Sequence, residues 1–215
     1  IKYLAEQKIY LKNSSPTSII NWFEKNPPLG GLGKIKLAEA FLEQGKTAEV
    51  EKLIKDGWTI AEIKKNDLGY YRAKFKRFLT SEDHLKRADY LAWERKYWDL
   101  KRMLKYLPKD ERALYNARQI LMSNSYGVDN ARAKVPAHLK KDPGLEYDRL
   151  RWRNRRGRLE GSLEILYKNA NKTERQMIRP DLWWEQRKSV ARSLIYKKRY
   201  KTAYKISSEH SLSSG

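Results

Sequence analysis

Residues 35–58 read "IKLAEAFLEQGKTAEVEKLIKDGW", and this stretch decides the class of fold. In its first half, apolar residues recur at the spacing of one helix face up to Gly45, which is typical of a helix end. Thr47 then begins a second segment with the same spacing. The apolar residues concerned are Leu37, Phe41 and Leu42 before the glycine, and Val50, Leu53 and Ile54 after it. The pattern predicts two short amphipathic helices joined by a tight turn.

Helix signals of this kind recur along the whole chain. Val and Thr together number only ten, and no segment alternates apolar and polar residues as a strand would. Ser15 and Pro16 predict the start of one helix, Ser81 caps another that runs through Trp93, and Pro108 suits the first turn of a third. Two capping boxes are predicted, one from Thr59 with Glu62 and one from Asn171 with Glu174. The sequence therefore predicts an all-α protein.

The lengths of the segments predict how the helices are arranged. Most of them span about 8–15 residues, with breaks of about two to five, and such short connections make neighbouring helices antiparallel. A single hairpin cannot bury its apolar face, whereas stacked hairpins can. We expect an irregular α-solenoid, or superhelix, of antiparallel helical hairpins that resembles tetratricopeptide repeats. Residues 1–215 would form one such domain, and the glycine-rich residues 26–33 are the best candidate for a hinge.

The composition limits the chemistry of the chain. Lys and Arg number 47 against 26 Asp and Glu, and the resulting charge of +21 attracts polyanions. Cysteine is absent, which excludes thiol chemistry, zinc–thiolate sites and disulfides. The three histidines, His84, His138 and His210, lie far apart, so we expect neither a metal site nor a cofactor. No apolar run approaches the ~20 residues that a transmembrane helix needs.

A cluster of arginines lies at 149–158, where six of the ten residues are arginine. Helical spacing places Trp152 on the apolar side, Gly157 predicts a turn, and Asp148 can pair with Arg151. The cluster is then either an anion-binding ridge, since guanidinium groups bind carboxylates and phosphates in pairs of hydrogen bonds, or a solvated face whose stems cover apolar surface. The candidate binding residues are Arg151, Arg153, Arg155, Arg156 and Arg158.

Two further segments present similar alternatives. Trp183 and Trp184 lie about 100° apart on a helix, so one can be buried while the other stacks on a sugar ring, or both can be buried between helices. The basic residues 196–201 that follow are expected to form a solvated turn. Asp83 and His84 are adjacent, but no nucleophile or orienting partner lies nearby in the sequence, which favours a structural role for both.

The same segments resemble a known family. The stretches concerned are "NPPLGGLGKIKLAEAFLEQGKTAEVEKLIKDGW" (26–58), "LTSEDHLKRADYLAW" (79–93), "ARAKVPAHLKKDPGLEYDRLRWRNRRG" (131–157) and "RPDLWWEQRKSVARSLIYKKRYKTAYKISSEHSLSSG" (179–215). In order and spacing they resemble the superhelical domain of the large soluble lytic transglycosylases of bacteria, particularly the alphaproteobacterial forms. The resemblance covers nearly the whole chain.

The resemblance implies a periplasmic protein that acts on peptidoglycan. Members of the family cleave the bond between N-acetylmuramic acid and N-acetylglucosamine and leave a 1,6-anhydro end. Their helical hairpins surround or support a separate lysozyme-like domain, in which one glutamate acts first as general acid and then as general base. The implied partners of this chain are peptidoglycan, through the arginine cluster and the two tryptophans, and a catalytic domain of its own protein. We expect the chain to be a monomer.

The catalytic signature of the family is absent. It consists of Glu-Ser followed later by Gly-Leu-Met-Gln, and neither occurs in this sequence. No glutamate therefore inherits the catalytic role, and we predict that the chain is inactive by itself. A secretory signal is expected before Ile1 and a lysozyme-like segment after Gly215. Nucleic acid is not expected as a partner, although a basic helical repeat that binds RNA and a tetratricopeptide-like protein scaffold remain the alternatives.

Overall fold

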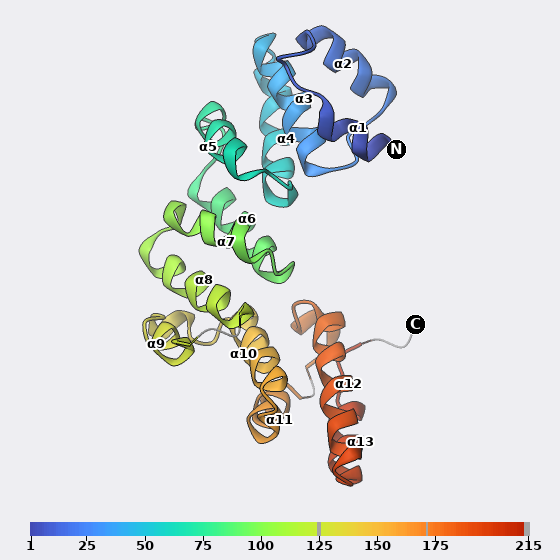
Figure 1. The fold of residues 1–215 in the computed structure, drawn as a ribbon, viewed down its shortest axis with the longest axis vertical. Coiled ribbons are helices and arrows are strands. Elements are labelled where there is room, and N and C mark those ends of the chain that lie inside the picture. The colour runs from blue at the N-terminus through green and yellow to red at the C-terminus, as the bar shows by residue number, and fades with distance from the viewer. Residues whose placement is uncertain (124–125, 171, 213–215) are drawn as a thin grey trace. The chain divides into compact units, whose positions relative to one another are not determined.

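In a computed structural model, the chain is described over residues 1–123, 126–170 and 172–212 (Figure 1). These residues form 13 α-helices and three short 3-10 helices, and no strand occurs among them. Helix accounts for 73% of the structure. The prediction of an all-α protein is confirmed.

The chain divides into two compact units, residues 1–115 and 116–215, and the division falls inside helix α8. Residues 26–33, the predicted hinge, lie within the first unit. The first unit contains α1 (Lys2–Lys8), α2 (Pro16–Lys25), α3 (Gly31–Glu43), α4 (Thr47–Ile60), α5 (Lys65–Lys74), α6 (Ser81–Trp93), α7 (Tyr97–Met103), the 3-10 helix η1 (Leu104–Tyr106) and the first half of α8 (Lys109–Met122).

The second unit contains the rest of α8 and the helices that follow it. These are α9 (Val128–Ala133), the 3-10 helix η2 (Ala137–Leu139), α10 (Pro143–Arg155), α11 (Leu159–Lys168), the 3-10 helix η3 (Glu174–Gln176), α12 (Pro180–Tyr196) and α13 (Tyr200–Ser208). Its core includes Trp183, whose ring centroid lies 5.6 Å from that of Tyr147.

Four pairs of consecutive helices share one kind of turn, and we call these pairs hairpins: α3–α4, α6–α7, α10–α11 and α12–α13. The two helices of each pair contact each other, and a three-residue turn joins them. The middle residue of each turn has a left-handed backbone, with φ of 74° at Gly45, 57° at Arg95, 65° at Gly157 and 57° at Lys198.

The hydrogen bonds of these turns are the same as well. The N–H of the third turn residue donates to the carbonyl five residues earlier, at 3.0, 2.9, 2.9 and 2.8 Å in the four hairpins. This is the 6→1 bond of the Schellman motif, which satisfies a carbonyl that the helix end leaves open. The third turn residue is basic in every case: Lys46, Lys96, Arg158 and Arg199.

Each second helix buries the residue that lies five positions after the left-handed one. These residues are Val50, Leu100, Ser162 and Ala203, and none is more than 4% exposed. All four have small or medium-sized side chains, which allow the second helix to approach its neighbours closely. One repeated backbone geometry thus positions four helix pairs whose sequences differ.

Glycines at the start of α3 allow close packing in the segment that we predicted as a hinge. A Cβ on Gly31 would lie 2.5 Å from the backbone nitrogen that follows α4, and a Cβ on Gly33 would lie 2.5 Å from Oε2 of Glu6. Glu6 is only 1% exposed and accepts hydrogen bonds from the N–H groups of Leu29 and Gly30. Its carboxylate, from a different helix, therefore holds the backbone that leads into α3, where the positive end of the helix dipole favours a negative charge.

Buried basic side chains bind the ends of neighbouring helices. Lys36 donates to the carbonyls of Glu6 (2.9 Å) and Gln7 (2.8 Å) at the end of α1, and Arg187 donates to the carbonyl of Ile206 in the last turn of α13 at 2.7 Å. The last carbonyls of a helix lack partners within it and carry the negative end of its dipole. A cation placed there satisfies both requirements, so part of the positive charge of this chain is structural.

Some predicted helix ends are wrong in detail. Thr59 lies inside α4, where its hydroxyl donates to the carbonyl of Lys55, so the predicted capping box with Glu62 does not form. The cap of α6 is Thr80, one residue before the predicted Ser81, in a capping box with Asp83. The cap predicted at Ser15 is confirmed, because its hydroxyl accepts from the N–H of Ser18 at 3.1 Å. The box predicted for Asn171 and Glu174 lies outside the described residues, since Asn171 is not among them.

Candidate functional site

The arginine cluster lies at the end of α10 and in the turn to α11, as predicted, and the structure divides it into two parts. Arg153 donates to the carbonyl of Gly161 and, at 2.9 Å, to Glu164 Oε2. Arg155 donates to the carbonyls of Leu121 (2.7 Å) and Met122 (2.9 Å), which are the last residues of α8. Arg153 therefore links α10 to α11, and Arg155 links α10 to the end of α8.

The other part is formed by Arg156 and Arg158, both exposed in the turn. Their guanidinium groups lie 5.6 and 4.6 Å from the ring centroid of Trp152, within the range of a cation–π contact. These three residues line a groove of about 240 Å³, whose other wall is formed by residues 126–130. Trp152 is 9% exposed, and its buried indole N–H has no hydrogen-bond partner among the described residues.

Asp148 has a different partner from the one predicted. Its carboxylate accepts a 2.8 Å hydrogen bond from Nε of Arg118, and both side chains are almost completely buried, so the pair with Arg151 expected from the sequence is wrong. Gly144 makes room for this pair, because a Cβ there would lie 2.2 Å from the Arg118 guanidinium carbon. Arg151 lies half-buried on α10.

The two tryptophans of α12 have different environments. Trp183 is 2% exposed and belongs to the core. Trp184 is half-buried, its ring centroid lies 5.1 Å from that of His210, and Lys188 Nζ lies 5.9 Å from the same ring. Of the two alternatives, the arrangement with one tryptophan in the core and the other at an edge describes this helix. The structure does not assign either ring a ligand.

His84 and Asp83 have structural partners. The Nδ1 of His84 accepts from the indole N–H of Trp58 at 3.2 Å, and burial lowers the pKa of this histidine. Asp83 closes the capping box with Thr80, accepting from the backbone N–H and the hydroxyl of Thr80 at 2.8 Å each. Arg87, four residues after Asp83 on the same helix, donates to the carbonyl of Trp58.

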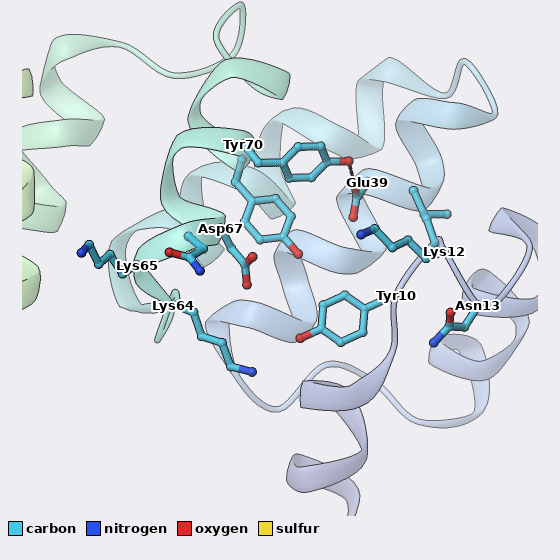
Figure 2. Close-up of a pocket in the computed structure, with 11 residues that line it drawn as sticks. Tyr10, Lys12, Asn13, Glu39, Lys64, Lys65, Asp67 and Tyr70 are labelled. Atoms are coloured by element: carbon cyan, nitrogen blue, oxygen red, sulfur yellow. Dashed lines mark hydrogen bonds between the residues drawn. The ribbon is translucent and has the colours of Figure 1, made fainter.

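The first unit contains a cavity that was not predicted from the sequence. Figure 2 shows it between the segment that follows α1, the middle of α3 and the start of α5. Its volume is about 810 Å³, and it is open to solvent. Tyr10 comes from the first segment, Glu39 from α3, and Asp67 with Tyr70 and Tyr71 from α5.

One side of this cavity is a hydrogen-bonded network. Glu39 is 5% exposed, accepts from the hydroxyl of Tyr70 and pairs with Lys74 at 3.0 Å. Lys74 also reaches Glu43 at 2.7 Å. Burial lowers the pKa of Lys74, but its hydrogen bonds to Glu43, Tyr70 and Glu39 outweigh burial and raise that pKa above its ordinary value. The charge of Glu39 is therefore balanced within the protein.

The other polar groups of the cavity have no such partners. Tyr71 is 3% exposed, and neither its hydroxyl nor the half-buried carboxylate of Asp67 makes a hydrogen bond or ion pair with any other described residue. Burial raises the pKa of Tyr71, and the negative charges of Glu39 and Asp67 raise it further. The phenol therefore stays protonated near neutral pH and can donate.

Lysines surround the opening of the cavity. In Figure 2 the side chains of Lys12 and Lys64 reach toward it from opposite sides, whereas Lys65 points away. The Nζ of Lys36 lies over the ring of Tyr10, 4.1 Å from its centroid. Burial lowers the pKa of Lys36 to about 8. The cavity thus combines an acidic interior with a basic rim.

The described residues contain neither a cluster of metal ligands nor a membrane-spanning helix. Within the part of the chain that the structure describes, no three His, Cys, Asp or Glu side chains are grouped as metal ligands. None of the described helices is both long and apolar enough to cross a bilayer. Comparison with known protein families, curated proteins and solved structures finds no match for this chain.

Proposed function

We propose that this chain is the non-catalytic superhelical part of a periplasmic lytic transglycosylase and that its basic surface contacts anionic peptidoglycan. The hairpins would stack as an irregular α-solenoid that supports a catalytic domain elsewhere in the protein. The proposal joins the sequence resemblance with a fold in which helix pairs recur. Cleavage to 1,6-anhydro products would belong to the catalytic domain.

The observation that carries the proposal is the hairpin turn that occurs four times with a basic third residue. Repeated supersecondary units that bury one face are the building blocks of solenoids. Lys96 and Arg199 form ion pairs with glutamates on other helices. Lys46 and Arg158 form no ion pair with the described residues and would place positive charge along one edge of such a stack. Diffuse attraction of this kind suits a polymer whose peptide stems carry carboxylates.

Within the arginine cluster, the geometry favours Arg156 and Arg158 as the contacts with the polymer. Arg153 and Arg155 bind backbone carbonyls away from the groove. Arg156 and Arg158 line the groove itself, and their guanidinium groups lie beside the Trp152 ring. An exposed ion pair contributes about 0–1 kcal/mol, so binding through two arginines would be weak and dependent on salt.

The test is sedimentation of the chain with purified peptidoglycan sacculi at an ionic strength of about 0.01 M and again at about 0.15 M. We expect binding that weakens with salt and that falls about tenfold in the double variant R156E/R158E, because two favourable contacts become repulsive. The matched control is K52E/K76E, which makes the same change of charge at two exposed lysines of the first unit.

Two results would contradict the proposal. One is tighter binding to single-stranded RNA than to sacculi in a direct competition, which would favour the nucleic-acid alternative. The other is the appearance of 1,6-anhydro muropeptides when sacculi are incubated with this chain alone, which would show that it is catalytic.

A further inference from the structure

The cavity of the first unit contains a carboxylate, that of Asp67, which forms no ion pair with the described residues and interacts with the charge of buried Lys36 only at longer range. Several other acidic residues of this unit form ion pairs, as in Lys34–Asp56, Lys55–Glu51 and Lys96–Glu62. Asp67 is half-buried, makes no hydrogen bond or ion pair with the described residues, and belongs to a chain of net charge +21. Removing a carboxylate from water without a partner is unfavourable, so a cation from a ligand would improve its environment.

The rim of the same cavity offers the opposite charge. Lys12 and Lys64 make no ion pair within the described residues, and they approach the opening from two sides (Figure 2). Lys64 is also the N-cap of α5, and no side chain caps this ten-residue helix. Its first backbone N–H groups add to the attraction of an anion at this side.

The walls between the two charges are aromatic. Tyr10 and Tyr70 line the cavity, and Tyr71 forms part of its interior with a hydroxyl that can donate. Aromatic rings pack against short aliphatic chains and leave polar ends free to bind. The volume of about 810 Å³ lies within the range of ~300–1,000 Å³ typical of small-ligand sites.

We propose that this cavity binds a zwitterionic amino-acid group, with the ammonium of the ligand against Asp67 and its carboxylate between Lys12 and Lys64. Such a group occurs in free amino acids. It also occurs in the diaminopimelate of peptidoglycan stems, and that source rests on the proposed function. The chemistry of recognition is the same for both sources.

The first experiment uses three ligands with related carbon chains. These are meso-diaminopimelic acid, which carries both charges, pimelic acid, which carries only carboxylates, and 1,5-diaminopentane, which carries only ammonium groups. Titration calorimetry measures affinity, and backbone amide shifts in NMR spectra locate the site. We expect diaminopimelic acid to bind about tenfold or more tightly than either other ligand, with shifts at Asp67 and Tyr71.

Two variants of the protein test the contacts with the two ends of the ligand separately. Asp67→Asn is expected to weaken binding of diaminopimelic acid about tenfold, since a charge-assisted hydrogen bond is lost. Lys64→Gln, at an exposed position where folding is not at risk, is expected to weaken it through the carboxylate. Glu24→Gln is the matched control, because it removes one exposed carboxylate from the same unit and should leave the affinity unchanged.

The proposal is overturned by equal binding of the three ligands, by unchanged affinity in both D67N and K64Q, or by shifts confined to residues outside the cavity.

Sacculi stripped of their stem peptides by an amidase distinguish the sources. If D67N and the wild type bind intact and stripped sacculi equally while D67N has lost diaminopimelic acid, the ligand is a free amino acid. Binding of sacculi without binding of diaminopimelic acid refutes this inference and leaves the proposed function standing, and the reverse result refutes the proposed function alone.

Discussion

At the scale of single residues, the unusual feature is the number of basic side chains that donate hydrogen bonds to the carbonyls of helix ends. Lys36, Arg155 and Arg187 each donate to carbonyls in the last turns of other helices. Short helices have many ends relative to their length, and each end leaves carbonyls without partners. A fold made of short helices therefore uses basic side chains that a sequence reading would assign to the surface.

Lys36 provides a pH-dependent test of this arrangement. Burial lowers its pKa in the folded protein from the ordinary 10.5 to about 8. Between these two values the unfolded chain binds more protons at this position than the folded protein does, so the contribution of Lys36 to the free energy of unfolding increases from about pH 8 to pH 10.5. Below pH 8 the lysine is charged in both states, and this contribution is constant at its lowest value.

We expect the difference in the free energy of unfolding between the wild type and Lys36→Met to rise with pH across that window, as measured by urea unfolding. The exposed Lys52→Met serves as the control and should give a difference that does not change with pH. A flat difference for Lys36→Met would contradict the role of burial.

At the scale of elements, the hairpin turns explain which parts of the fold could be predicted. Gly45 and Gly157 marked two turns in the sequence, and the structure places left-handed residues at both. Arg95 and Lys198 occupy the same position in two other turns, and nothing in their chemistry signals a left-handed backbone. Helices were predictable from apolar spacing, and residues 196–201 were expected to form a turn. The left-handed backbone at Arg95 and Lys198 was not predictable, because tertiary packing imposes a conformation that the residue itself disfavours.

These turns provide a matched pair of substitutions. Gly45→Ala is expected to destabilise the protein by about 1 kcal/mol through backbone strain alone, because a Cβ at Gly45 meets no atom within 4 Å. Lys198→Gly is expected to stabilise it by up to about 1 kcal/mol, because the strain at φ 57° is removed.

Thermal and chemical unfolding measure both changes. Lys197→Gly is the control for the second, since its φ of −83° is ordinary and glycine there brings only the entropic cost of a flexible residue. If Lys198→Gly and Lys197→Gly had equal effects, the left-handed conformation would carry no strain.

The candidate site was harder to predict than the helices. Tyr10, Glu39 and Asp67 meet in one cavity although they are far apart in the sequence, and no local pattern connects them. The arginine cluster was visible because its residues are neighbours in the sequence. What the sequence could not distinguish is which arginines bind backbone carbonyls, since that depends on helix ends such as that of α8, which lie more than 30 residues away.

At the scale of the whole molecule, the net charge of +21 is larger than the few basic side chains that bind helix-end carbonyls can account for. The remaining charges repel one another in the compact state, and exposed ion pairs compensate only weakly. We expect Tm to rise when the ionic strength is increased from about 0.01 to about 0.15 M, because salt screens the repulsion.

Differential scanning calorimetry measures this dependence. A variant with three exposed lysines neutralised, K52Q/K76Q/K201Q, should show a higher Tm at low salt and a smaller increase with salt. A Tm that fell as salt was added would indicate that attractive surface pairs outweigh repulsion.

Helix α8 belongs to both units, because the division between them falls between Tyr115 and Asn116 in its interior. A break in the chain at that point would deprive up to about four N–H and four C=O groups of their partners. Gene fusions or truncations that respect the compact units would therefore split a helix, and viable recombination points must lie before Lys109 or after Met122. We therefore expect the two units to occur together in one polypeptide.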